Sequence, residues 1–363
     1  STLKNISSVS NRGKVVANVN AAYQSSSIVV RVLTALFLGI QRFSGLVGLV
    51  ALQMVGLVVN LLASREMSLI PSRSTIVYKK GRTVMVLLKE AMGSVTFRRR
   101  LILRWISTAV AVIFGLTTPF LRIELGLSNS VVVLYSVTLG VSVMAASYIS
   151  KQFSDRLGSR PLVFFSTLFS LFFFMAWVLV TKSVSPVWFF ILGFFTNFFV
   201  SLISLLTYRL VAQVMPDEET VAFNSMVNFV IAIIAFGVGI LSGFLADKAD
   251  IARALFTLDG RPAGNGYTLV FLFAIVLTSI ETLVASRLQE LGAYSSQAAA
   301  QVIFSMHGLR AVSMIEKLEH TSDPAKRRFL MLSLGENLNN LATSELRSIL
   351  ASPFSPNKLE AVR

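Results

Sequence analysis

The chain of 363 residues contains no cysteine and only two histidines, His307 and His320. The missing cysteines exclude disulfide bonds and thiolate metal ligands, and two histidines near the C-terminus do not make a zinc cluster or a catalytic triad. The G-x-x-x-x-G-K-[ST] pattern of ATP-binding loops is also absent, and no nucleophile and base recur on one face. We therefore expect neither enzymatic chemistry nor ATP-driven transport, and we expect no cofactor.

Charged residues make up only 14% of the chain, while hydrophobic residues make up 54% and include 28 phenylalanines. The mean hydropathy is +0.70. A soluble domain could not hide this many apolar side chains from water, so the lipid bilayer is the expected surroundings. Stretches of about 20 apolar residues can each cross a bilayer as a helix. Eight spans are predicted, at residues 15–39, 43–64, 101–121, 129–150, 162–181, 187–208, 220–246 and 267–286.

Lysine and arginine are unevenly divided between the segments that join these spans. Seventeen lie on the side that includes residues 65–104 and 151–160, and six lie on the other side. Basic residues favour the cytoplasmic side, which predicts a multi-pass plasma-membrane protein (the inner membrane in a bacterium) with a cytoplasmic C-terminal tail. Topology and anionic lipid headgroups thus account for much of the net charge of +15, and nucleic acid is not an expected partner.

The basic segment between the fourth and fifth spans reads KQFSDRLGSRP, residues 151–161. It resembles the signature G-x-L-x-D-R-x-G-R-[RK] of the major facilitator superfamily, which joins two helices on the cytoplasmic side of each six-helix half. The matching positions, which the resemblance assigns to gating, are Asp155, Arg156, Gly158 and Arg160. The chain departs from the signature in having Lys151, Phe153 and Ser159.

Further stretches resemble the same family in a consistent order, including GRTVMVLLKEAMGSVTFRRRLILRW and VMPDEETVAFNSMVNF. Under this resemblance the eight spans correspond to family helices five to twelve, and four helices are expected upstream of this chain. The implied organisation is a transporter domain at 1–288, with a partial N-terminal half at 1–64, a linker at 65–100 and a six-helix half at 101–288. The fold class is an all-α membrane bundle of the family type. The implied function is secondary active transport of a small solute by alternating access, with a coupling ion as a further partner.

The first span carries polar residues at helical spacing, on one stripe that lipid cannot cover. They are Asn20, Gln24, Ser27, Arg31 and Thr34. Arg31 lies near the middle of the span, where a bare charge is costly. Two hypotheses remain open: Arg31 attracts an anionic substrate, or it pairs with a carboxylate on one of the helices expected upstream of this chain.

The sixth and seventh spans carry similar stripes, made of Asn197, Ser201, Ser204 and Tyr208 and of Asn224 and Asn228. Together with the first stripe they form the predicted substrate pathway. The alternative for each residue is a hydrogen bond that joins two membrane helices. Glu281 in the eighth span is either a proton-coupling acid or, as its position near the helix end favours, a snorkelling or packed side chain.

Residues 289–363 mix polar and apolar residues at helical spacing, which predicts a soluble, helical tail. Ser322-Asp323-Pro324 and Phe354-Ser355-Pro356 each predict a helix start, and the offset of 32 residues between them is similar to HEAT-type repeats. An irregular helical tail is the alternative. The repeats raise a second hypothesis for the whole chain, namely a transporter-like membrane scaffold or sensor whose tail binds a cytoplasmic protein.

Overall fold

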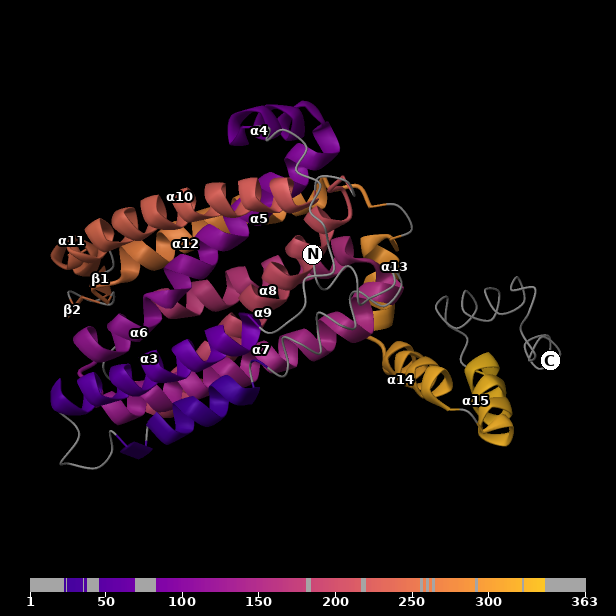
Figure 1. The fold of residues 1–363 in the computed structure, drawn as a ribbon, viewed down its shortest axis with the longest axis horizontal. Helices are drawn as coiled ribbons and strands as arrows, with labels where there is room; N and C mark the ends of the chain where they lie inside the picture. Colours follow the sequence, from indigo (N-terminus) through magenta and orange to yellow (C-terminus); the bar gives the residue numbers. More distant parts are fainter. Residues whose placement is uncertain are drawn as a thin grey trace.

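The computed structural model shows an almost wholly helical chain with a bundle of long helices (Figure 1). The residues that it describes are 23, 25–34, 36–37, 46–68, 83–180, 184–216, 220–254, 257–258, 261–262, 265–290, 293–321 and 323–336.

The helices before the middle of the chain include a short apolar helix at Ser25–Thr34. They continue as α3 Leu46–Ser68, α4 Val84–Gly93, α5 Val95–Gly115, α6 Thr117–Pro119, the π-helical turn η3 Phe120–Glu124, α7 Asn129–Leu157 and α8 Ser159–Val178. The later elements are α9 Pro186–Ala212, α10 Thr220–Ala246, α11 Ala249–Ala254, the strands β1 Thr257–Leu258 and β2 Arg261–Pro262, α12 Thr268–Ser286, α13 Ser296–Ile303, α14 Met306–His320 and α15 Pro324–Glu336. The two strands pair antiparallel.

Six helices of the described chain are long and apolar enough to cross a membrane, which confirms the last six predicted spans. They are Val95–Glu124, Asn129–Ser154, Ser159–Val178, Pro186–Ala212, Ala222–Ala246 and Thr268–Ser286. Their backbone groups are paired within each helix, as a hydrocarbon environment requires. The predicted first span is described only in part, as the helix at Ser25–Thr34, and the second corresponds to α3, whose side chains are mostly exposed.

The connection predicted at residues 151–161 is much shorter than expected. The helix α7 continues to Leu157 and α8 begins at Ser159, so Gly158 alone separates them. Gly158 has φ 85° and ψ 163°, a conformation that only glycine adopts readily. The basic residues extend the two helices instead of forming an open loop, because a glycine at this one position is enough to reverse the chain.

Serine side chains at helix N-termini and contacts between aromatic rings stabilise the other helices. The hydroxyls of Ser94, Ser128 and Ser295 accept hydrogen bonds from the first turns of α5, α7 and α13. In the core, the indole of Trp177 donates to Thr196 at 3.0 Å and lies against ring partners from η3 and α12. The core therefore joins α8 to α9, η3 and α12.

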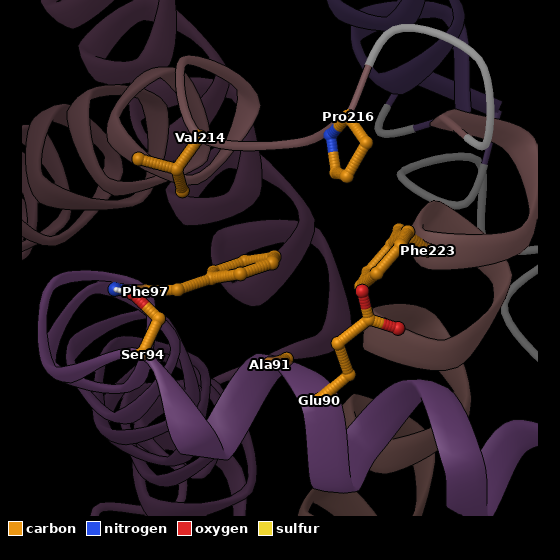
Figure 2. A pocket seen from close by; sticks show the side chains of 7 residues that line it. All are labelled: Glu90, Ala91, Ser94, Phe97, Val214, Pro216 and Phe223. Atoms are coloured by element: carbon orange, nitrogen blue, oxygen red, sulfur yellow. Dashed lines mark hydrogen bonds between the residues drawn. The ribbon is translucent and has the colours of Figure 1, made fainter.

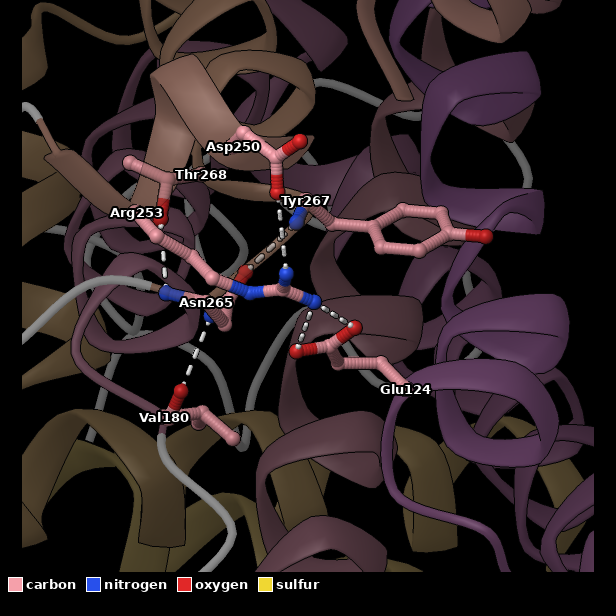
Figure 3. A network of polar contacts seen from close by, with 7 residues as sticks. All are labelled: Glu124, Val180, Asp250, Arg253, Asn265, Tyr267 and Thr268. Carbon is pink, nitrogen blue, oxygen red and sulfur yellow. Dashed lines mark hydrogen bonds and ion pairs between the residues drawn. The ribbon is translucent and has the colours of Figure 1, made fainter. Parts of the chain in front are cut away.

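Asn265 joins three segments at the end of the bundle that carries α11 (Figure 3). Its Nδ2 donates to the carbonyls of Trp177 at 3.0 Å and Val180 at 2.9 Å, and its Oδ1 accepts from the backbone N–H of Tyr267 at 2.9 Å. Its own N–H donates to the hydroxyl of Thr268 at 3.0 Å. The start of α12 is thus held against the end of α8.

An ion pair stabilises the same end. Arg253 of α11 donates to both carboxylate oxygens of Glu124, at 3.0 and 2.8 Å, and lies 3.5 Å from Asp250 (Figure 3). Burial raises the pKa of the nearby Tyr267 phenol, and the carboxylates of Glu124 and Asp247 act in the same direction. The phenol therefore stays neutral beside this charged pair.

The helices α13, α14 and α15, called the tail helices below, lie at the other end of the bundle, called the tail end (Figure 1). Phe304, which follows α13, packs against Phe165 and Phe169 of α8, with ring centroids 5.7 and 6.2 Å apart. Val312 and Ile315 of α14 belong to the same buried cluster as the adjoining ends of α7, α8 and α9. The predicted helix start at Pro324 is confirmed by α15. The second copy of the repeat lies outside the described residues, so the HEAT-like repeat stays a prediction.

Candidate functional site

The polar stripe of α9 lies in the seam between α5 and α7. Asn197 donates from Nδ2 to the carbonyl of Leu139 at 2.8 Å and to the hydroxyl of Ser142 at 2.7 Å, both on α7. Ser201, one turn further along, is half-buried. Asn197 therefore joins two helices, which is the structural alternative considered for it, and the stripe continues past it toward the tail end.

Arg104 of α5 meets the next part of this stripe. Its Nη1 donates to the carbonyl of Ser204 at 2.9 Å and to the Ser204 hydroxyl at 2.8 Å. Its guanidinium carbon lies 5.9 Å from the ring centre of Tyr208, which is 45% exposed. A guanidinium with neutral hydrogen-bond acceptors and an aromatic ring keeps its full positive charge. Within the described residues no carboxylate pairs with Arg104.

The helix at Ser25–Thr34 crosses α7 in the antiparallel direction. The hydroxyl of Ser25 lies 3.9 Å from the sulfur of Met144, and Ile28 lies so close to Gly140 that a Cβ there would meet it at 2.8 Å. Gly140 therefore permits the close approach of these two helices.

Arg31 lies at the far end of this crossing, where its Nη1 donates to the backbone carbonyl of Ser136. Ser27 and Thr34 are, like Arg31, half-buried on the same helix. In the part of the chain that the structure describes, no carboxylate contacts Arg31. The predicted stripe residues Asn20 and Gln24 lie outside the described residues.

Asn224 and Asn228 lie on α10, away from the α9 stripe. Asn224 is half-buried and Asn228 is exposed. The α10 helix packs against α5, α4 and α12. The structure therefore brings together the α9 stripe, Arg104 and, further along α7, Arg31, and it leaves the α10 pair separate.

The signature residues at the tail end contact α14 and the last residue of α12. The guanidinium of Arg156 donates to the carbonyl of Val312 in α14, and that of Arg160 reaches the carbonyl of Ser286 at 3.4 Å. A Cβ on Gly158 would lie 2.5 Å from the Cβ of Ala293. The side chain of Asp155 lies outside the described residues.

Glu290 organises this contact. Its Oε2 accepts from the backbone N–H of Arg160 at 2.8 Å, in the first turn of α8, and its Oε1 accepts from Gln213 at 3.2 Å. A carboxylate at a helix N-terminus is stabilised by the helix dipole. Arg100 reinforces the junction by donating to the carbonyls of Leu210 at 2.8 Å and Gln289 at 3.2 Å.

A separate cleft of about 370 Å³ lies between α4, the start of α5 and the start of α10 (Figure 2). The rings of Phe97 and Phe223 face each other there with centroids 5.7 Å apart, and Glu90 lies at the side of the cleft. The remaining lining residues are Ala91, Ser94, Val214 and Pro216. The cleft results from the docking of α4 on α5 and α10, and it does not include the α9 stripe.

The sequence patterns missed Arg104 and Glu290. Arg104 was counted with the basic residues of the segment 65–104, although the predicted span 101–121 also contains it and α5 already begins at Val95. Its spacing of four residues from Arg100 was the available signal. Glu290 follows the last span without any motif of its own. Among the described residues no group of three or more His, Cys, Asp or Glu side chains could hold a metal ion.

A family model described as Major Facilitator Superfamily matches residues 2–240, which is more than half of the chain. No curated protein and no solved structure matches the chain.

Proposed function

The chain belongs to the major facilitator superfamily and is a multi-pass membrane transporter, and we propose that it moves a small anionic solute by secondary active transport with alternating access. The transporter domain of this proposal covers 1–288, and the residues from 289 onward form a cytoplasmic tail. The pathway follows the α9 stripe, which is flanked by α5 and α7. The lipid bilayer surrounds the helices, and a coupling ion completes the cycle.

The proposed preference for an anionic solute rests on Arg104, whose guanidinium pairs with no carboxylate among the described residues. This guanidinium lies within a membrane span and over the ring of Tyr208, and among the described residues it donates hydrogen bonds only to Ser204. Arg31 has a similar arrangement, because its acceptor is a backbone carbonyl of α7. A cation inside a membrane protein is costly unless a countercharge or water accompanies it. An anionic solute supplies that charge on the pathway.

We expect Arg104→Gln to weaken solute binding strongly. A panel of small carboxylates and phosphates is first screened for compounds that raise the melting temperature of the purified protein, and uptake of a stabilising compound into proteoliposomes is then measured. Loss of a charge-assisted hydrogen bond of about 1.5–3 kcal/mol corresponds to a rise in KM of about 10- to 150-fold. Arg104→Lys should recover part of the affinity.

The matched control for Arg104 is Arg122→Gln, because Arg122 is exposed at the other end of the bundle and donates to the carbonyl of Leu127. Its KM should equal that of the wild type. An unchanged KM for Arg104→Gln, in protein that melts normally, would contradict the proposed anion site.

The proposed orientation places the tail end in the cytoplasm. The chain has no native cysteine, so single cysteines report topology directly. A cysteine at the exposed Gln297 of α13 should be shielded from an impermeant thiol reagent in intact cells and labelled after permeabilisation. A cysteine at the exposed Asp250 of α11 should be labelled in both conditions. The reverse pattern would overturn the orientation.

The signature residues Asp155, Arg156, Gly158 and Arg160 serve gating in this proposal. Support comes from the bond of Arg156 to Val312, which ties the α7–α8 junction to α14, and from the bond of Arg160 to Ser286, which ties it to the end of α12. A movement of this junction during the cycle would then be transmitted to the tail helices.

The second candidate function, a membrane scaffold or sensor, is supported by the same docking. The tail helices share a buried cluster with α7, α8 and α9, so a cytoplasmic protein bound to α14 or α15 could bias the bundle. Transport that is unaffected by Arg104→Gln, together with a protein partner that requires α14 and α15, would favour the sensor over the transporter.

A further inference from the structure

Glu281 lies in the interior of the bundle. It belongs to α12 and is 0% exposed, and neither of its carboxylate oxygens has a hydrogen-bond partner among the described residues. The hydroxyl of Thr278, three residues earlier on the same face of α12, is also fully buried and unpartnered. The sequence favoured a snorkelling or packed side chain, and complete burial rules out snorkelling.

Among the described residues, no charged side chain on the helices around α12 pairs with Glu281. The helix α12 packs against α8, α5, α10 and α11. Within the bounds of these elements α10 has no charged residue, and the others carry Arg98, Arg99, Arg100, Arg104, Arg160, Asp250 and Arg253. Arg99 and Arg160 reach carbonyls at the last turn of α12, at 3.0 and 3.4 Å, and leave the carboxylate of Glu281 unpaired.

Glu124 provides the contrast within the same bundle. Its two oxygens accept from Arg253, which compensates a negative charge. Glu281 has neither a cation nor a hydrogen-bond donor among the described residues. An ionised carboxylate taken out of water without compensation is strongly disfavoured, and such a group becomes neutral by binding a proton.

We propose that Glu281 is a proton-binding site inside the six-helix bundle, occupied at neutral pH in this conformation. A proton needs no ligand beyond the carboxylate, whereas Ca²⁺ or Mg²⁺ requires about six oxygen ligands. This inference rests on the proposed function in one respect: in the transporter, the proton on Glu281 is the coupling ion. Proton binding itself does not depend on solute transport.

Infrared spectroscopy of the purified full chain in liposomes tests the site. At pH 7 the wild-type spectrum should contain the C=O band of a neutral carboxylic acid, and Glu281→Gln should remove it. Glu124→Gln is the matched control and should leave the band in place. Replacing sodium by a large organic cation at constant pH should not change it. A wild-type spectrum without this band, or a band that sodium abolishes, would overturn the proposal.

A second measurement requires no variant. Dicyclohexylcarbodiimide adds to neutral carboxyl groups inside membranes, so peptide mass mapping of the wild-type protein should find the adduct on Glu281 and none on Glu124. Adduct formation should decline as the pH is raised. Labelling of Glu124 in preference to Glu281 would contradict the assignment even if the Gln variant did not fold.

Coupling is tested separately from proton binding. With a compound identified by the Arg104 experiments, an acidic external pH should accelerate uptake by the wild type and should have no effect on Glu281→Gln. An equal response in both proteins would remove the coupling role. Failure of all uptake, with the infrared band intact, would instead count against the proposed transport function.

Discussion

Gly158→Ala should release the tail helices from the bundle and destabilise the protein. Alanine at φ 85° and ψ 163° occupies a backbone region that costs about 1–3 kcal/mol for residues other than glycine. The added Cβ would also lie 2.5 Å from the Cβ and 2.9 Å from the Cα of Ala293. The backbone N–H of Tyr294 donates a hydrogen bond to the carbonyl of Leu157 at 3.0 Å, and this hydrogen bond limits how far Ala293 can move away.

The measurement for Gly158→Ala combines a thermal melt in detergent with the rate of tryptic cleavage at the exposed Arg310 of α14. We expect a lower melting temperature and faster cleavage. Gly237→Ala in α10 is the control, because a Cβ there meets nothing within 4 Å and alanine favours a helix. Cleavage and melting like those of the wild type would show that the close contact between Gly158 and Ala293 is absent in solution.

Asn265→Ala should cause a large loss of stability at the other end of the bundle. The substitution removes the partners of the Val180 carbonyl and the Tyr267 N–H, and it takes one of its hydrogen bonds from the Trp177 carbonyl, which still accepts from the N–H of Val180. Each buried polar group left unsatisfied costs about 1–3 kcal/mol, so the two groups together are expected to cost at least about 2 kcal/mol. Thermal unfolding in detergent measures the effect.

Asn265→Asp separates the two roles of this side chain. Aspartate can accept a hydrogen bond from the Tyr267 N–H, but it cannot donate one to the carbonyls of Trp177 and Val180. Its melting temperature should therefore lie below that of the wild type, and the loss should exceed that of Asn60→Ala, an exposed position on α3. A wild-type melt for Asn265→Asp would show that the bonds to Trp177 and Val180 contribute nothing.

The tail end illustrates what a local pattern can and cannot predict. The motif placed Asp155, Arg156, Gly158 and Arg160 at a helix junction, and the structure has the junction at Gly158. The pattern could not predict that Glu290, 130 residues beyond Arg160, accepts from its backbone N–H. A carboxylate with no motif around it is recognised as a helix cap only when the two segments are placed together.

The polar residues inside the spans show the same limit. Helical spacing places Asn197, Ser204 and Tyr208 along one stripe of α9, but spacing gives no information on what faces that stripe. The structure adds Ser142 of α7 as the partner of Asn197 and Arg104 of α5 as the partner of Ser204. These partners lie 55 and 100 residues away in the chain, beyond the reach of periodicity.

The amino-acid sequence by itself determined that the chain is an all-helical membrane protein of the major facilitator superfamily. Length, hydropathy and backbone pairing in lipid are local properties, so each span could be predicted alone. Only the tertiary structure decided which polar groups are compensated: Glu124 is paired with Arg253, Arg104 has neutral partners, and Glu281 has no partner in the described part of the chain. Compensation depends on distances between side chains of different helices, and those distances arise only when the helices pack.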